Sequence, residues 1–370
     1  MDDNDLVSVI IPAFNAATTL AETLDNVRGQ THRHLEIIVV DDGSRDHTVR
    51  IVEAHAAEDE RIRLIRQENG GVARARNTGA AASRGAYLAP VDADDLWHPE
   101  KIARQIAALH AAGPEAGYAY TFYRHVDAAG RVIGDGGSRV EGAAFLRSIL
   151  GNFVTNGSSL LIRRAAFDSV GGYDPGLRDA GLQGCEDYLL QMLIARHWRV
   201  VCVPEYLTGY RKLEGSMSDD RLRMTRSQCA AFDEVARRVP EAPAEILNAT
   251  RAKTLARSAV LLGPRRGREA LGMLRAAFAV DARTAAHSVA RTIALDARDA
   301  WRRFMRGGSR PIGERPQFGD LALDQPLYDE PRRTKLTARM AALAARDEAF
   351  FVPSPPPLLP PEGRRQERRA

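Results

Sequence analysis

Residues 6–15 read LVSVIIPAFN, an apolar and largely β-branched run that ends in proline, alanine, phenylalanine and asparagine. Such a run is typical of a strand that is buried on both faces of a parallel sheet. The pattern continues to residue 90, with further strands expected at 35–40, 61–66 and 86–90 and helices at about 17–30, 46–58 and 72–83. This alternation predicts right-handed βαβ units, and therefore an α/β fold whose mainly parallel sheet carries helices on both faces.

Three polar loops follow these strands, at Pro12–Asn15, Asp41–Ser44 and Asp92–Asp95. The carboxyl ends of parallel strands share one edge of the sheet, and α/β folds bind their ligands at that edge. The three loops together therefore predict a nucleotide pocket.

The third loop belongs to the acidic run VDADDLW, residues 91–97, which contains a D-x-D pattern. Carboxylates two residues apart on a turn direct their oxygens into one space, and oxygen ligands suit the hard cations Mg²⁺ and Mn²⁺, which also bridge to phosphate. The run therefore predicts a metal–diphosphate site. A solvated acidic turn or a helix N-cap is the alternative, and it would be preferred if the run stood alone.

Two common phosphate-binding loops are absent from the sequence. The first strand-to-helix turn, PAFNA at residues 12–16, contains no G-x-G-x-x-G, which argues against a dinucleotide-dependent dehydrogenase. No G-x-x-x-x-G-K-[ST] loop occurs either. Phosphate is therefore expected to be held by a metal or by side chains.

Composition narrows the class of protein. The 370 residues are 44% hydrophobic and 27% charged, which predicts a folded chain of two or three units. Three cysteines without a metal or disulfide spacing, an acidic amino terminus and no apolar run of about 18 residues predict a cytoplasmic location. The net charge of +4 arises in residues 301–370, and no nucleic-acid-binding motif accompanies it.

The stretch after the acidic run is expected to complete the first domain. A helix is predicted at 99–112, and two or three antiparallel strands at 115–140 with turns at 127–130 and 134–137. A further helix should run from Gly184 to about Arg196, followed by a strand at 199–204. A domain boundary is predicted near residue 220.

Six motifs occur in an order that resembles family 2 glycosyltransferases of the GT-A fold: VSVIIPAFN, VVDDGS, NGGVARARN, VDADDLW, VGGYD and GCEDY. The resemblance covers roughly residues 6–218. It implies a Rossmann-like sheet and an inverting transferase that uses a nucleotide-activated sugar, usually a UDP- or GDP-sugar, together with Mg²⁺ or Mn²⁺.

The resemblance also implies a set of residues around the donor. Pro12 and Phe14 would flank the nucleobase, Asp41 would accept a hydrogen bond from the N–H of its ring, and Asn69 and Arg76 would line the nucleotide pocket. Without the resemblance, Asp41 is better interpreted as a turn and helix-cap residue, and Arg76 as part of a solvated helix face.

Four acidic residues are implied at the reacting centre. Asp92 would hold the ribose, and Asp94 would coordinate the metal. Asp187 is the predicted catalytic base, since an acceptor hydroxyl needs a carboxylate to take its proton. The adjacent Glu186 is ranked second, and the alternative for both is a pair of acids that stabilises a helix N-terminus.

One position departs from the family pattern. The segment YRKLEGSMS, residues 210–218, has Leu213 where relatives often carry a histidine that helps to bind the metal or diphosphate. The third protein ligand is therefore in doubt, with Arg211, Ser216 or water as substitutes.

The chain is expected to divide into a GT-A domain over 1–219, a helical region over 220–306 and a Pro/Arg-rich, largely disordered tail over 307–370. The last helix carries an apolar stripe between Ala286 and Phe304 with arginines around it. The stripe predicts packing on a core or peripheral contact with an anionic membrane, near a lipid-linked acceptor.

The predicted function is therefore transfer of a sugar to a hydroxyl of a surface polysaccharide or lipid-linked glycan. Two alternatives come from other classes: a non-catalytic sugar-nucleotide or glycan-binding module of the same fold, and a nucleotidyltransferase. The intact Asp92, Asp94 and Asp187 argue against the first, and the lack of a glycine-rich phosphate loop near the amino terminus argues against the second. The sequence does not indicate which base, sugar or acceptor is bound.

Overall fold

The computed structural model describes residues 5–182, 184–213, 215–263, 266–305, 315–326 and 342–353. Its strands are β1 (Val7–Ala13), β2 (Leu35–Asp41), β3 (Ile62–Arg66), β4 (Tyr87–Pro90), β5 (Leu96–Trp97), β6 (Ala116–Val126), β7 (Val132–Gly136), β8 (Leu160–Arg163) and β9 (Arg199–Arg211). They form one sheet in the order β3-β2-β1-β4-β8-β6-β9-β5, with β7 paired to β6. Strands β1 to β4 pair in parallel, as the alternating sequence predicts, whereas β8 pairs antiparallel with both β4 and β6.

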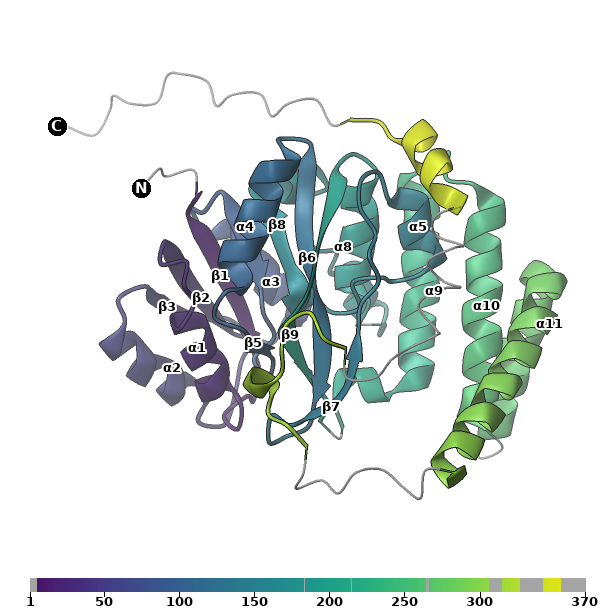
Figure 1. Ribbon diagram of the computed structural model, residues 1–370, viewed down its shortest axis with the longest axis horizontal. Coiled ribbons are helices and arrows are strands. Elements are labelled where there is room, and N and C mark those ends of the chain that lie inside the picture. Colours follow the sequence, from purple (N-terminus) through teal and green to yellow (C-terminus); the bar gives the residue numbers. More distant parts are fainter. Residues whose placement is uncertain are drawn as a thin grey trace.

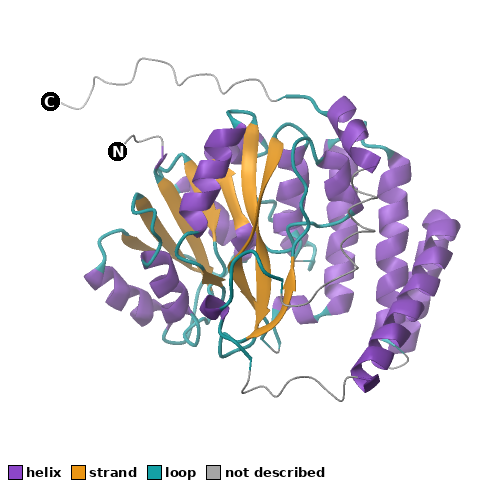
Figure 2. Cartoon of the chain, viewed as in Figure 1, coloured by secondary structure: helices purple, strands orange, loops and turns teal. Residues whose placement is uncertain are grey.

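Helices cover both faces of this sheet (Figures 1 and 2). They are α1 (Leu20–Arg28), α2 (Thr48–Glu58), α3 (Val72–Ala81), α4 (Lys101–Ala112), α5 (Phe145–Leu150), α6 (Arg164–Ser169), α7 (Gly176–Asp179), α8 (Glu186–Ala195), α9 (Arg221–Arg238), α10 (Ala244–Leu262) and α11 (Gly267–Met305). Alternate residues of β1 enter different cores, because successive side chains of a strand point to opposite faces. Val9 and Ile11 pack with α1, α2 and α4, whereas Ile10 packs with α3 and α8.

The close packing of α3 on β1 depends on a glycine. A Cβ atom added at Gly79 would lie 2.6 Å from Cγ2 of Ile10, closer than two carbon atoms can approach without a shift of the backbone. The glycine thus fixes the depth at which α3 sits on the sheet, and α3 carries Arg76 toward the functional site.

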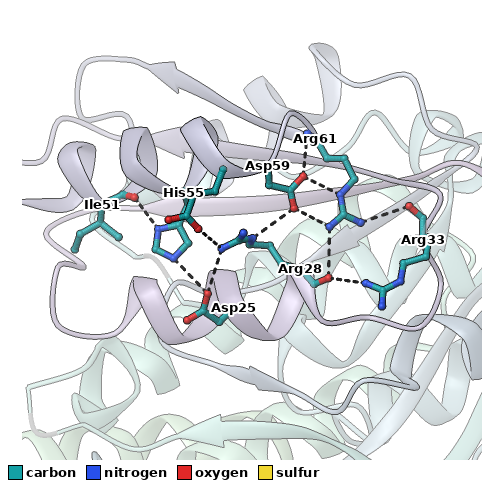
Figure 3. Close-up of polar contacts among 8 residues, drawn as sticks. Asp25, Arg28, Arg33, Ile51, His55, Asp59 and Arg61 are labelled. Atoms are coloured by element: carbon teal, nitrogen blue, oxygen red, sulfur yellow. Dashed lines mark hydrogen bonds and ion pairs between the residues drawn. The ribbon is translucent and has the colours of Figure 1, made fainter.

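A polar cluster joins the C-terminal ends of α1 and α2 to the start of β3 (Figure 3). Arg61 donates to both carboxylate oxygens of Asp59, at 2.9 and 2.7 Å, and Nε of Arg28 lies 3.4 Å from the same carboxylate. The hydrogen bonds from Arg61 lower the pKa of Asp59 to about 2. Nε2 of His55 lies 3.4 Å from Asp25, which ties the two helices together. The cluster fixes the βαβ unit at its amino-terminal edge, away from the loops that carry the predicted site.

Two sequence predictions in the first domain are wrong in detail. Gly134–Gly136 continue strand β7 where a turn was expected, because their backbone pairs with residues 123–125 of β6. The strand predicted to end at Pro204 continues to Arg211. Its pairing with β6 shifts between Val203 and Tyr206, so that the proline falls in an irregularity of the ladder, where a missing N–H is tolerated.

The helical region begins at Arg221, close to the predicted boundary. Helices α10 and α11 pack through small residues, with Ala256, Ala277 and Ala285 fully buried between them. Helix α11 bends at Asp281, whose φ and ψ of −157° and 95° are not helical. Among the described residues, no helix combines the length and the apolar character that a membrane span requires.

Two stretches of the predicted tail fold against the first domain, where the composition indicated disorder. In residues 315–326, the carbonyl of Pro316 accepts from the N–H of Val132 at 2.9 Å, and Phe318 is buried beside β5 and β7. Residues 342–350 form a helix, in which Asp347 accepts from Arg147 of α5 at 2.6 Å. The other residues of the 307–370 prediction lie outside the described part of the chain.

Candidate active site

A cavity of about 1150 Å³ opens beyond the carboxyl ends of β1, β2 and β4. Eight of the nine residues predicted for the site line it: Pro12, Phe14, Asn69, Arg76, Asp92, Asp94, Glu186 and Asp187. Segments from residue 12 to residue 187 of the sequence therefore line one cavity at this edge of the sheet.

The acidic run is held in place by its last carboxylate. Asp95 is fully buried, and it accepts hydrogen bonds from the hydroxyl of Ser158 and from the N–H of Arg211, the latter at 2.9 Å. Asp94, the predicted metal ligand, lines the cavity instead. Burial and the neighbouring Asp92 raise the pKa of Asp94 to about 6. Asp95 therefore holds the loop in place, whereas the adjacent Asp94 faces the cavity.

Arg76 connects the acidic run to the start of α8. Its guanidinium donates to Oδ1 of Asp92 at 2.5 Å and to Oε1 of Glu186 at 3.1 Å, and it lies 5.2 Å from the centre of the Tyr173 ring. Only 3% of the residue is exposed, so the solvated helix face considered for Arg76 is wrong. One buried cation therefore holds both acidic walls of the cavity.

Glu186 and Asp187 differ in how their oxygens are used. Glu186 is buried, and its carboxylate accepts from Arg76 and from the N–H of Gly184 at 2.9 Å. Asp187 accepts from the N–H of Tyr188 at 2.7 Å through Oδ1, and its Oδ2 has no hydrogen-bond partner among the described residues. Burial and Glu186 raise the pKa of Asp187 to about 7, against the opposing effect of Arg76. Of the two, Asp187 has the oxygen available to take a proton.

Asp41 does not reach the cavity. It is 1% exposed, its Oδ1 accepts from the N–H of Ser44 at 3.1 Å, and it is absent from the residues that line the pocket. The next residue, Asp42, does line it, and its carboxylate accepts from the N–H groups of Gly70 and Gly71 at 2.8 and 2.7 Å. The bond to Ser44 favours the interpretation of Asp41 as a turn-capping residue. Asp42 instead fixes the loop that follows Asn69, through its bonds to Gly70 and Gly71.

The loop after β1 presents an aromatic ring at the cavity. Phe14 is 51% exposed, an unusual environment for a phenylalanine. The next residue, Asn15, has a φ of 50° and is held by hydrogen bonds with Ser44 and Arg45. The loops after β1 and β2 are thereby joined to each other.

Sequence reasoning missed Arg178, which α7 brings to the cavity four residues after the VGGYD motif. Its guanidinium donates to Oδ1 of Asn69 and lies 4.0 Å from Asp42. Gly71, at a φ of 87°, leaves room for it, because a Cβ there would lie 2.4 Å from Cδ of Arg178. A basic residue just after this motif was the only signal in the sequence.

The segment that lacks the usual histidine is placed differently from the expectation. Arg211, Leu213 and Ser216 all line the cavity, and Arg211, which is 2% exposed, also holds the surrounding backbone. Its guanidinium donates to the carbonyl of Asp94 at 2.6 Å, to the carbonyl of Ala128 at 2.8 Å and to the carboxylate of Glu22 at 2.6 Å. Arg211 therefore supports the acidic loop through these hydrogen bonds.

A family model described as glycosyl transferase family 2 matches residues 8–170. Glycosyltransferase GlyG of Streptococcus pneumoniae is 40% identical over 94 residues, which are 25% of this chain and 31% of that protein. The chain thus spans about a third of the length of this curated relative.

Two solved structures have similar folds. TarS 1-349 of S. aureus in complex with UDP-GlcNAc has a TM-score of 0.56 at 17% identity, over 87% of this chain and 99% of that one. The mannosyltransferase PcManGT of Pyrobaculum calidifontis, in complex with GDP-Man and Mn²⁺, has a TM-score of 0.53 at 22% identity, over 92% and 86% of the two chains. Residues 8–170 therefore resemble glycosyl transferase family 2, the fold is similar to those of TarS and PcManGT, and the acidic run and the GCEDY motif meet at one cavity.

Proposed function

We propose that this protein is an inverting glycosyltransferase that moves a sugar from a UDP- or GDP-sugar to a hydroxyl of a surface polysaccharide or lipid-linked glycan. One observation carries the proposal: buried Arg76 holds Asp92 and Glu186 together, and Asp94 and Asp187 line the same cavity on either side of it. A donor-binding wall and a candidate base therefore face one ligand space.

The donor side consists of the loops after β1, β2 and β4. Pro12 and the exposed ring of Phe14 offer an apolar surface for a nucleobase, and Asn69 and Arg178 offer polar groups beside it. Asp92 is 34% exposed at its side chain and is available to a ribose hydroxyl. The two similar structures are complexes with UDP-GlcNAc and with GDP-Man, which supports a nucleotide-sugar as the donor.

The residues present suit a divalent cation. Asp94 and Asp92 are oxygen donors two residues apart, and their mutual repulsion within a buried site, which contributes to the raised pKa of Asp94, is relieved by a positive charge. The described residues contain no cluster of three or more metal-binding side chains, so diphosphate and water oxygens would complete the coordination. When bound, Mg²⁺ or Mn²⁺ would neutralise charge on the departing diphosphate.

Asp187 acts on the acceptor. Its carboxylate takes the proton of the attacking hydroxyl while the new bond forms between that oxygen and the anomeric carbon. The bond between the anomeric carbon and the diphosphate oxygen breaks on the opposite side, and the electron pair leaves with the nucleoside diphosphate. A single displacement of this kind inverts the anomeric configuration. Glu186, which is engaged by Arg76 and Gly184, positions the turn that carries Asp187.

A thermal-shift panel of UDP, GDP and their sugars, with and without Mn²⁺, tests donor binding. We expect one nucleotide series to stabilise the protein, more strongly with the metal. Product analysis separates the alternatives: free nucleoside diphosphate indicates glycosyl transfer, pyrophosphate indicates nucleotidyl transfer, and binding without turnover indicates a non-catalytic module. Either of the last two results refutes the proposed function.

We also propose a cytoplasmic protein that contacts the inner face of the membrane through α11. Phe278 and Ile293 are 45% and 55% exposed on this helix, with Arg275 and Arg291 close by in sequence, whereas Val289 packs toward α10. Exposed apolar groups beside arginines suit an anionic bilayer. Sedimentation with vesicles that contain phosphatidylglycerol should carry the protein down, and an Ile293→Ser/Phe278→Ser variant should remain in solution. Equal binding by both proteins would refute the role of α11.

A further inference from the structure

The wall of the cavity opposite the donor loops is made by the helical region. Residues of α9 and α10 line it, and they are Arg221, Met224, Thr225, Gln228, Thr250, Lys253, Thr254, Arg257 and Ser258. Three of these side chains are basic, and none is acidic. The acidic residues on the two helices, among them Asp233 and Glu245, do not line the cavity. Helices α9 and α10 therefore give the cavity a basic wall, which is Arg221, Lys253 and Arg257, with Asp219 lining the cavity just before α9.

The size of the cavity leaves room for a second substrate at this wall. Pockets for a single drug-sized ligand enclose about 300–1000 Å³. The volume here is about 1150 Å³, which exceeds that range. Asp187 lies at the start of α8, which packs against α9, so the candidate base and the basic wall line the same cavity.

Besides Arg76 and Arg178, two residues that line the cavity have a buried polar atom that is unsatisfied. Thr250 is 2% exposed and Asn156 is 3% exposed, and both line the cavity. Oγ1 of Thr250 and Nδ2 of Asn156 have no hydrogen-bond partner among the described residues. Buried polar groups are normally paired, so an unpaired hydroxyl and an unpaired amide N–H indicate a ligand that supplies hydroxyl groups.

Lys253 connects the wall to the loop that carries Asn156. Its Nζ donates to the carbonyl of Leu150 at 3.1 Å, at the end of α5. The basic wall and the unsatisfied amide thus belong to one continuous surface, contributed by α5, α9 and α10.

We propose that the acceptor carries an anionic group, a phosphate or a carboxylate, that binds the basic wall while its hydroxyl groups hydrogen-bond to Thr250 and Asn156. The proposal rests on the proposed function, because it assigns the second substrate of the same site. Arginine and lysine at one face select phosphate and carboxylate over neutral sugar. The anionic group of the acceptor anchors it at the basic wall, and the reacting hydroxyl of the acceptor then lies beside Asp187.

The test uses the full chain and matched oligosaccharides. The probes are a mannose pentasaccharide with one phosphate, the same pentasaccharide without it, and tetragalacturonate, which carries carboxylates. Affinity for each is measured by calorimetry, and stabilisation by the preferred nucleotide with Mn²⁺ is measured on the same samples. The variants are Arg257→Gln, Lys253→Gln and Thr250→Val, and the matched control is Arg226→Gln, an exposed position on α9 that does not line the cavity.

We expect at least one anionic probe to bind about tenfold more tightly than the neutral pentasaccharide. Arg257→Gln should remove most of this preference, and Arg226→Gln should retain it. Whether phosphate or uronate binds better identifies the class of acceptor. Thr250→Val should weaken all three oligosaccharides equally, since it removes a hydroxyl and no charge.

Two results would overturn the proposal. Equal affinity for charged and neutral probes shows that the wall does not recognise an anion, and loss of nucleotide binding in Arg257→Gln shows that the wall serves the donor. Because donor binding is measured separately, intact donor stabilisation with no anion preference refutes only this inference. Absence of donor stabilisation in the unmodified protein refutes the proposed function itself.

Discussion

Replacing Arg76 with methionine removes the cation that joins the acidic loop to α8 while keeping a side chain of similar length. The change leaves two carboxylates without their partner. The Glu186 side chain is 7% exposed and the Asp92 side chain is 34% exposed, so the loss at Glu186 is nearly unscreened and the loss at Asp92 is partly relieved by water. Breaking a buried ion pair costs about 3–5 kcal/mol. We expect the lower part of that range, about 3 kcal/mol of unfolding free energy.

Urea unfolding monitored by tryptophan fluorescence measures this loss, and Arg74→Met is the control. Arg74 lies two residues away on the same helix and pairs with Asp179 at 2.9 Å, but the two side chains are 49% and 54% exposed. Exposed pairs of this kind contribute about 0–1 kcal/mol. The control should therefore have a urea midpoint close to that of the unmodified protein, and its unfolding free energy should depend on urea concentration with the same slope.

A double variant shows whether Glu186 is the partner that matters. Glu186→Gln removes the charge that Arg76 neutralises, so Arg76→Met/Glu186→Gln should lose less stability than the two single variants combined, by at least about 1 kcal/mol. The reasoning is refuted if Arg76→Met unfolds like Arg74→Met, or if the two single effects simply add. Nucleoside diphosphate release should also fall in Arg76→Met, because both walls of the cavity lose their common support.

Three other changes test the remaining assignments. Asp187→Asn should lower the turnover number about 10²–10⁴-fold, the usual contribution of a general base, with nucleotide stabilisation retained; unchanged turnover would exclude Asp187 as the base. Because the pKa of Asp187 is raised to about 7 and only its ionised form accepts a proton, turnover should be half-maximal near pH 7 and level off above about pH 8; a flat profile would contradict this. Asp347→Asn should lower the unfolding free energy by about 3 kcal/mol, since it weakens the buried pair with Arg147. Glu348→Gln, which removes an exposed pair with Arg199, should lower it by less than about 1 kcal/mol. Equal losses in the two variants would show that burial does not set the strength of these pairs.

The βαβ half of the fold follows from the sequence because its signals are local. Buried strands are short apolar runs, and the loops that carry Phe14 and Asp94 come at their carboxyl ends, as β1 and β4 show. The pairing of β5 with β9 had no such signal, since β5 is two residues long and its partner lies more than a hundred residues away.

Individual side chains of the site were harder to predict for a related reason. Asp94 and Asp95 are chemically identical, and which one turns inward is decided by Ser158 and Arg211, far along the chain. In the sequence alone Arg76 resembles a surface residue of a helix. Its burial arises from contacts with Glu186 at the start of α8 and with Asp92 after β4. Sequence motifs locate the site, whereas the division of tasks within it arises from long-range packing.

The hydrogen bond between Arg147 and Asp347 forms late in synthesis, because 200 residues separate the two partners. A ribosome that adds about 5–20 residues per second needs roughly 10–40 s to make that stretch. During this interval α5 lacks the helix at 342–350 whose Asp347 accepts from Leu146 and Arg147. A message cut short before codon 347 would yield a chain with all of its donor loops but without the carboxylate that holds Arg147 of α5.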